Sequence, residues 1–163
     1  MHRLIAAALA LVALPALARQ DAPKKHAGFE RMKELVGTWE SAKEGGMGVT
    51  YRLTAGGSAL LETIAPGGDH EMLTLYTLDG DDLVLTHYCV LGNQPRMKAE
   101  KSDKTDVLRF TCVGGGNMKC DKDKHMHSAV FHLEEKDTLE SEWTMQAGGM
   151  AAGAVQMSLK RKK

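Results

Sequence analysis

Two histidines and a cysteine in the second half of the chain have the types and spacing of a metal site. His125 and His127 are separated by one residue, so on a strand their side chains point to the same face of the sheet. Cys120 lies just upstream, before the polar stretch Asp121-Lys122-Asp123-Lys124. Thiolate and imidazole together suit zinc or copper. These residues predict a transition-metal site; the alternative is a polar hairpin tip whose histidines are not ligands.

The segment Thr86–Met97 starts as a strand and ends in a polar turn that contains a proline. Asn93, Gln94 and Arg96 at this strand end offer hydrogen bonds and a charge to the polar end of a ligand. Strict alternation places Arg96 outside if Met97 points inward, so Arg96 contributes only where the preceding proline distorts the strand. The alternative is a turn whose amide side chains bond to local backbone groups.

Inward-facing positions of the expected strands are rich in methionine and in large apolar or aromatic side chains. Such residues line adaptable cavities, and barrels of eight or more strands often hold a ligand among them. The predicted wall consists of Met72, Tyr76, His87, Met97, Trp143 and Met145. We expect a small, mostly apolar or amphipathic ligand in the barrel interior; ordinary core filling by these side chains is the alternative.

The chain has three cysteines, Cys89, Cys112 and Cys120. Cys112 and Cys120 flank a glycine-rich loop, which makes them the pair that a disulfide would join in an oxidising compartment. The alternative is three unpaired thiols, with Cys89 and Cys112 as small apolar core residues. An odd count leaves at least one thiol free or bridged to another chain.

A nucleophilic enzyme is the least favoured class. His87 and Cys89 lie close together in the sequence, and a histidine near a thiol is one requirement of such chemistry. A covalent mechanism also needs a group of hydrogen-bond donors for the developing oxyanion, and no motif supplies it. We therefore assign no catalytic residues.

The elements that must position these groups are one short helix and a series of strands. Apolar residues recur at helical spacing in the segment 27–36, and Gly37 ends that pattern. Nine turn signals rich in glycine, asparagine and aspartate then separate about ten short strands. Strands joined by short turns form an antiparallel meander, which can close into a barrel. The prediction is an all-β, up-and-down barrel of about ten strands, with eight as the competing count.

Turn length predicts which residues share a face. A turn of two or four residues at Asp79-Gly80 would place Tyr76 on the same face as His87. The same argument across the segment 134–137 puts His125 and His127 on the face of Trp143. The strands 70–78 and 83–91 carry apolar residues on both faces, which leaves a homodimer open.

The N-terminal residues have the pattern of an export signal. A basic start is followed by an apolar run and by the small-residue motif Ala16-Leu17-Ala18. We expect a signal peptide over residues 1–18, a loose leader over 19–26 and one barrel domain over 27–163, located in the periplasm or outside the cell. No later apolar run is long enough for a membrane helix, so the mature protein should contain no integral membrane segment. The formal net charge of zero gives no reason to bind nucleic acid.

Two sequence motifs carry a family resemblance. Gly37-Thr38-Trp39 opens the first expected strand, and residues 86–97 read THYCVLGNQPRM. Between Leu35 and Leu159 the chain resembles a family of uncharacterised, exported bacterial proteins with a lipocalin-like (calycin-type) barrel. The resemblance implies the fold and no established activity. Ten-stranded haem-binding barrels of the nitrobindin type share the Gly-x-Trp start, which would make His87 or His127 a haem ligand.

Trp39 has a structural role in this scheme. In a closed barrel the first strand neighbours the last, which here ends in basic residues. We expect Trp39 at the closed end, stacked with Arg161 or Lys160 by a cation–π contact, with Gly37 and the helix nearby.

Overall fold

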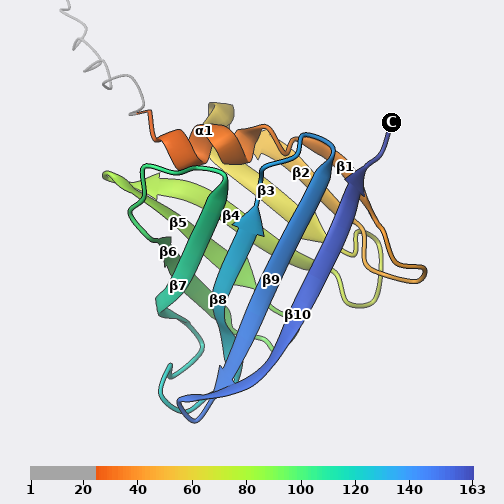
Figure 1. Ribbon diagram of the computed structural model, residues 1–163. Coiled ribbons are helices and arrows are strands. Elements are labelled where there is room, and N and C mark those ends of the chain that lie inside the picture. Colours follow the sequence, from red (N-terminus) through yellow and green to blue (C-terminus); the bar gives the residue numbers. More distant parts are fainter. Residues whose placement is uncertain (1–24) are drawn as a thin grey trace, which may run out of the picture.

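The computed structural model describes residues 25–163, which form a ten-stranded antiparallel barrel with one short α-helix at one end (Figure 1). The N-terminal residues 1–24, and with them the predicted signal peptide and most of the leader, lie outside the described residues. The elements in chain order are α1 Ala27–Lys33, β1 Gly37–Ser41, β2 Val49–Thr54, the 3₁₀ turn η1 Ala55–Gly57, β3 Ala59–Ile64, β4 Met72–Asp79, β5 Asp82–Tyr88, β6 Gln94–Ala99, β7 Val107–Gly116, β8 His125–His132, β9 Thr138–Ala147 and β10 Met150–Arg161.

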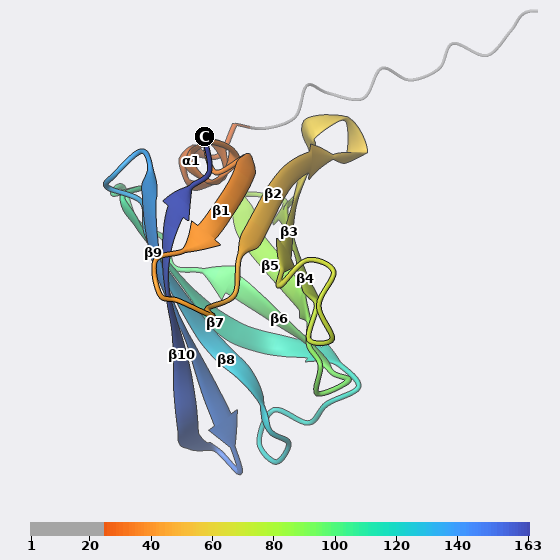
Figure 2. The same cartoon turned by 90° about the vertical axis from the view of Figure 1, so that its right-hand side faces the viewer.

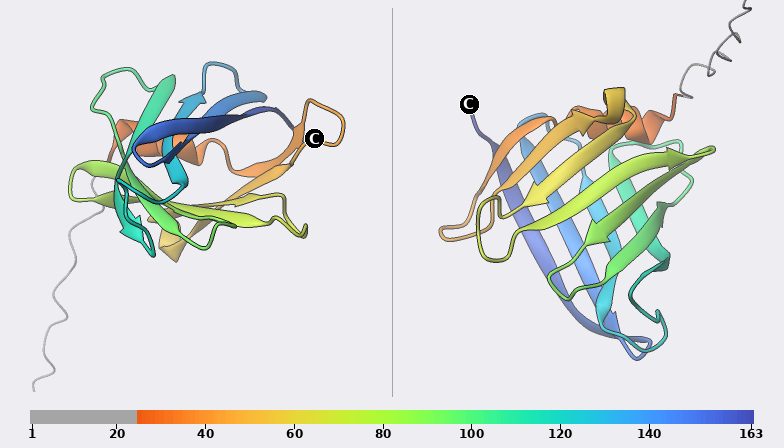
Figure 3. Two further views of the ribbon diagram at one scale, coloured as in Figure 1. Left: turned by 90° about the horizontal axis from the view of Figure 1, so that it is seen from below. Right: turned by 180° about the vertical axis from the view of Figure 1, so that it is seen from behind.

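The barrel closes because each strand pairs with the next one in sequence and β1 pairs with β10. Figure 3 shows this ring from below and the same strands from behind. The turn between β4 and β5 is short, with Asp79 opposite Asp82, and this register places Thr74 opposite His87. Full closure leaves no sheet edge for another chain to pair with. The prediction of an all-β, ten-stranded barrel is therefore confirmed.

Side chains alternate between the barrel interior and its outer surface. On β7, Leu108 and Phe110 are buried while Arg109 and Thr111 are exposed. On β6, Met97 is completely buried and lies between partly exposed neighbours. Three aromatic rings, those of Tyr76, Phe110 and Phe131, meet edge to face with centroids about 6.0 Å apart at the centre of this core.

The helix is shorter than the sequence pattern indicates. We expected it to run to Val36, but α1 ends at Lys33, with Glu34 as its C-terminal cap. The amides of Leu35 and Val36 donate to carbonyls three residues back, so the chain tightens into a turn before the strand. Gly37 has a φ of +137°, a backbone conformation that side-chain-bearing residues rarely adopt, and it begins β1 instead of capping the helix.

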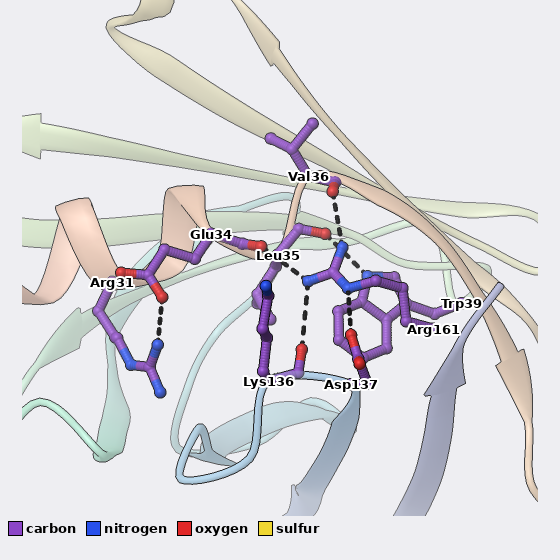
Figure 4. A network of polar contacts seen from close by, with 8 residues as sticks. All are labelled: Arg31, Glu34, Leu35, Val36, Trp39, Lys136, Asp137 and Arg161. Carbon is purple, nitrogen blue, oxygen red and sulfur yellow. Dashed lines mark hydrogen bonds and ion pairs between the residues drawn. The ribbon is translucent and has the colours of Figure 1, made fainter. Parts of the chain in front are cut away.

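Trp39 and Arg161 join the first strand, the last strand and the helix end (Figure 4). The Arg161 guanidinium lies over the Trp39 ring, 4.2 Å from its centroid, and the two residues face each other in the β1–β10 register. Trp39 Nε1 donates to the Leu35 carbonyl, while Arg161 donates to the carbonyls of Glu34 and Val36, each at 2.8 Å. Trp39 is 1% exposed. The expected cation–π contact is present, with Arg161 as the cation.

The two ends of the barrel differ. The helix and the β8–β9 turn lie at one end, where Arg31 bonds to the Leu133 carbonyl. The β7–β8 loop and the β9–β10 turn lie at the opposite end (Figure 2). A cleft of about 450 Å³ is present at the helix end, but its Arg31 and Arg161 are already bonded to Glu34 and to backbone carbonyls. Within residues 25–163, no helix has the length and apolar character needed to cross a membrane.

Candidate metal centre

Three potential metal ligands meet at the barrel end opposite the helix. Cys112 comes from β7, and His125 and His127 come from the start of β8. One ligand atom from each of these residues lies within 4.8 Å of the other two. His125 is completely buried, while Cys112 and His127 are partly exposed. The cluster is thus close to solvent yet anchored in the barrel wall.

Two β-bulges shape the cluster. The register of β6 and β7 shifts at Arg96/Met97, which leaves Val113 as the extra residue beside Cys112. The register of β8 and β9 shifts at Met126/Ser128, which makes His127 the extra residue. A bulge turns a side chain away from regular alternation, and bulges are frequent beside functional sites. Here one bulge lies beside Cys112 and the other contains His127, so both lie at the cluster.

The two histidines face each other through the nitrogens that would bind an ion. His125 Nε2 lies 3.2 Å from His127 Nδ1. His125 Nδ1 is 2.8 Å from the Asp123 carbonyl, which only accepts, so Nδ1 carries the hydrogen. The lone pair of a neutral His125 is therefore on Nε2, directed at His127. A backbone carbonyl that fixes the distal ring nitrogen is typical of metal-binding histidines.

A second thiol adds a fourth donor. Cys120, in the β7–β8 loop, places its Sγ 3.9 Å from the Sγ of Cys112. Both thiols are free and partly buried. The predicted disulfide partners are therefore neighbours, with their sulfur atoms in contact but not bonded.

The observed spacings match those of a tetrahedral ion. Zn–S bonds of about 2.3 Å and Zn–N bonds of about 2.05 Å, at the tetrahedral angle, separate two sulfur ligands by about 3.8 Å and two nitrogen ligands by about 3.3 Å. The sulfur pair in the structure is 3.9 Å apart and the nitrogen pair 3.2 Å apart. The sulfur pair and the nitrogen pair thus each have a spacing that one tetrahedral ion accepts, while Cys120 lies outside the three-residue cluster and contacts it through Cys112.

The protonation states suit metal uptake by exchange with protons. Burial, followed by the neighbouring His125, lowers the pKa of His127, so its imidazole is neutral at physiological pH. Burial is also the main cause that raises the pKa of the Cys112 thiol, with Cys120 adding to it. A transition-metal ion would bind this neutral imidazole and displace the thiol protons.

The loop that carries Cys120 is tied to neighbouring turns. Asn93 Nδ2 donates to the Lys124 carbonyl at 2.8 Å, one residue before His125. Asn117 Nδ2 donates to the Gly92 carbonyl at 2.7 Å. The Gly148 amide in the β9–β10 turn donates to the Lys122 carbonyl at 3.1 Å. These contacts fix the backbone on both sides of Cys120.

The three polar residues predicted to contact a ligand have other partners. Asn93 is buried and holds the β7–β8 loop, as described above. Gln94 Nε2 donates to the Gly92 carbonyl of its own turn at 3.1 Å. Arg96 lies on the outer surface and pairs with Asp79 at 2.7 Å. The role predicted for Arg96 at the barrel mouth must be corrected, because Pro95 does not disturb the alternation and Met97 takes the inward position.

The residues predicted to line the interior do lie there. Tyr76, His87, Met97 and Trp143 are at most 2% exposed, and Met72 and Met145 pack against the same core. They are joined by a carboxylate that the sequence analysis did not consider. Glu62 is completely buried and accepts hydrogen bonds from Tyr51 (2.6 Å) and Tyr76 (2.8 Å). Its position between the inward Leu60 and Ile64 of β3 was the available signal.

A polar chain extends from Glu62 to His87. The Thr74 hydroxyl bonds to Glu62 and lies 3.0 Å from His87 Nδ1. The His87 ring is 5.0 Å from that of Trp143, centroid to centroid. Burial lowers the pKa of His87 to about 4, so the ring is neutral at physiological pH. His87 Nε2 and Trp143 Nε1 are buried and have no partner among the described residues.

The structure changes the membership of the predicted metal site. The sequence pattern indicated His125, His127 and Cys120, and the structure adds Cys112 between the histidines and Cys120. The three predicted residues do lie at one barrel end, but the closest cluster contains Cys112. Sequence spacing alone did not connect Cys112 to His125, because the contact depends on the pairing of β7 with β8.

No model of a known protein family matches the chain, and no curated protein matches it either.

Proposed function

We propose that this barrel is an exported transition-metal-binding protein that holds one ion with Cys112, Cys120, His125 and His127. Zn²⁺ fits the donor set best, because two thiolates and two imidazoles in a tetrahedron are a common zinc environment. Cu⁺ is the competing ion, since it also favours soft sulfur donors. Export rests on the sequence pattern of residues 1–18.

The proposal rests on two interatomic distances that match those of a tetrahedral ion. Two sulfur atoms are 3.9 Å apart and two nitrogen atoms are 3.2 Å apart, and Cys112 belongs both to the sulfur pair and to the three-residue cluster with His125 and His127. The Asp123 carbonyl fixes the His125 ring, and Asn93 fixes the adjoining backbone. Three of the four donors are thus close together before the ion arrives, which reduces the entropic cost of binding.

Calorimetric titration of the reduced, metal-free protein with Zn²⁺ tests the proposal. We expect one ion per chain and release of protons from the two thiols. The variant His127→Ala removes one ligand on the outer side of the cluster and should weaken binding by at least about tenfold. His132→Ala is the matched control, because His132 is an exposed histidine on the same strand. Equal affinities for the two variants would refute the site.

A second candidate function is the binding of a small molecule in the barrel interior, as the sequence predicts. Two buried polar atoms favour it, His87 Nε2 and Trp143 Nε1, because an indole N–H is a donor and both atoms lack a partner among the described residues. If Thr74 donates to Glu62, His87 must donate through Nδ1 and present a lone pair at Nε2. The guest would then carry one donor and one acceptor group on a mostly apolar body.

Native mass spectrometry of the protein purified from its own source separates the two functions. A retained organic mass supports the second candidate, and a retained zinc or copper ion supports the first. If an organic molecule is retained, His87→Phe should abolish its retention while leaving zinc affinity unchanged. Retention by His87→Phe at the wild-type level would refute the interior site.

A further inference from the structure

The two cysteines of the candidate metal centre are also arranged to react with each other. Cys112 Sγ and Cys120 Sγ are 3.9 Å apart, which is close to contact between sulfur atoms. A disulfide bond is about 2.0 Å long, so the sulfur atoms need to approach by roughly 2 Å. Cys112 lies on β7 and the loop backbone on both sides of Cys120 is held by hydrogen bonds, so the approach falls to the Cys120 side chain and its immediate backbone. Both thiols are partly exposed and accessible to a small reagent.

A metal ion and a disulfide exclude each other at this site. Metal binding uses the thiolate forms of Cys112 and Cys120, whereas a disulfide has no thiolate. Oxidation would leave His125 and His127 as the remaining donors. Loss of a supporting contact to a ligand already weakens metal binding about 10–100-fold, so loss of two ligands should cost more than a hundredfold.

We infer that Cys112 and Cys120 form a thiol–disulfide switch, in which a low-molecular-weight disulfide oxidises the pair and expels the metal ion. The inference rests on the proposed function, because it requires that the reduced site holds an ion. It extends that function by naming the condition that empties the site.

The reaction is balanced as two exchanges. The Cys120 thiolate attacks one sulfur of the small disulfide, forms a mixed disulfide and releases one thiolate. The Cys112 thiolate then attacks the Cys120 sulfur, forms the Cys112–Cys120 bond and releases the second thiolate. The protein pair loses two electrons, the small disulfide gains them, and its two thiolates take protons from solvent. The metal ion leaves with its charge unchanged.

The assignment of the attacking residue follows from the surroundings of the two thiols. Cys112 lies on a paired strand and packs against the barrel core. Cys120 lies in a loop and is not among the residues packed on the core, so a reagent from solvent reaches it first, which favours Cys120 as the first nucleophile. Cys112 then acts as the resolving thiol from its fixed place on the strand.

The test uses zinc-loaded Cys89→Ser protein, in which the third thiol is removed. Zinc uptake by the reduced protein is measured first. Oxidised glutathione is then added, and released zinc, intact mass and peptide maps are followed together. We expect release of one zinc ion per chain, a mass lower by two hydrogen atoms and a Cys112–Cys120 peptide, all with the same time course. Dithiothreitol should restore zinc binding.

The two steps fail in different ways. If the reduced protein takes up no zinc, the proposed function is wrong, and the inferred switch is wrong as well. If zinc is taken up but remains bound while the disulfide forms, the switch alone is wrong. A stable mixed disulfide, or zinc loss with both thiols still reduced, also overturns it. In metal-free Cys89→Ser/Cys120→Ser protein, oxidised glutathione should consume the remaining Cys112 thiol at least about tenfold more slowly than it consumes the thiols of Cys89→Ser, because the first nucleophile is missing.

Discussion

The side-chain amide of Asn93 donates a 2.8 Å hydrogen bond to the carbonyl of Lys124, thirty-one positions along the chain. Asn93 ends the β5–β6 turn, and Lys124 is the residue before His125. The bond therefore links the polar segment 86–97 to the candidate metal centre. Asn93 therefore holds the β7–β8 loop next to His125.

Replacing Asn93 should weaken metal binding without removing a ligand. In Asn93→Asp the side chain has the same shape but no longer donates to the Lys124 carbonyl. We expect the Kd for Zn²⁺ to rise about 10–100-fold, as for other residues that orient ligands. Calorimetric titration of the reduced protein measures the change.

Gln94→Ala is the matched control for that experiment. Gln94 is the next residue, and its amide bonds to the Gly92 carbonyl of its own turn. Its Kd for Zn²⁺ should stay within about twofold of the wild-type value, since no contact to the β7–β8 loop is lost. If Asn93→Asp had the same Kd for Zn²⁺ as Gln94→Ala, Asn93 would have no role in positioning the site.

The Trp39–Arg161 contact should carry much of the stability of the closed end. Trp39→Ala removes a ring that is 1% exposed and should lower the free energy of unfolding by about 3–5 kcal/mol. A double-mutant cycle with Arg161→Ala should give a coupling energy of about 1–2 kcal/mol. Lys160→Ala, an exposed neighbour on β10, is the control and should show no coupling. Urea denaturation measures the three single and the two double variants, and additive effects of Trp39 and Arg161 would contradict the assignment.

The buried carboxylate of Glu62 makes stability dependent on its tyrosine donors. Tyr51→Phe removes a donor 2.6 Å from Glu62 and should cost about 1–3 kcal/mol of unfolding free energy. Burial raises the pKa of Glu62, so the stability from its protonated form is lost as the pH rises through the folded-state pKa. The cost of Tyr51→Phe should therefore grow with pH, because the ionised carboxylate needs both donors. Tyr88→Phe, at an exposed tyrosine, should cost little at any pH; a pH-independent cost for Tyr51→Phe would refute the argument.

His87 should make the metal-free protein sensitive to acid. Burial lowers its pKa from 6.5 to about 4, so the unfolded chain takes up a proton that the folded protein excludes. The stability gained from neutral His87 is complete above pH 6.5 and is lost as the pH falls toward 4, up to about 3 kcal/mol. In His87→Phe that part of the pH dependence should disappear, which urea denaturation over a pH series measures. Parallel stability curves for the two proteins would show that His87 contributes nothing to acid sensitivity.

Strand number, order and facing were predictable because they depend on local patterns. Alternation identified the inward Leu108 and Phe110, and the short turn after Asp79 fixed Tyr76 and His87 on one face. Trp39 was placed beside Arg161 or Lys160 because closure of the ring leaves the first strand next to the last, and the structure selects Arg161. Each of these inferences needs only neighbouring strands and turn length.

The composition of the site was less predictable because it depends on departures from regular pairing. The bulges at Val113 and His127 change which side chains converge, and alternation does not foresee a bulge. Cys112 was therefore assigned to the core or to a disulfide and not to the metal site. The role of Asn93 was missed for a related reason, because its partner is a backbone carbonyl in a distant loop.

X-ray absorption spectroscopy at the zinc edge reports directly whether two cysteines and two histidines hold the ion. The sample is the reduced protein loaded with one equivalent of Zn²⁺. We expect a four-coordinate ion with two sulfur ligands at about 2.3 Å and two imidazole nitrogens at about 2.0–2.1 Å. A first shell made only of oxygen and nitrogen, or a sulfur shell that persists unchanged when both Cys112 and Cys120 are replaced by serine, would contradict it.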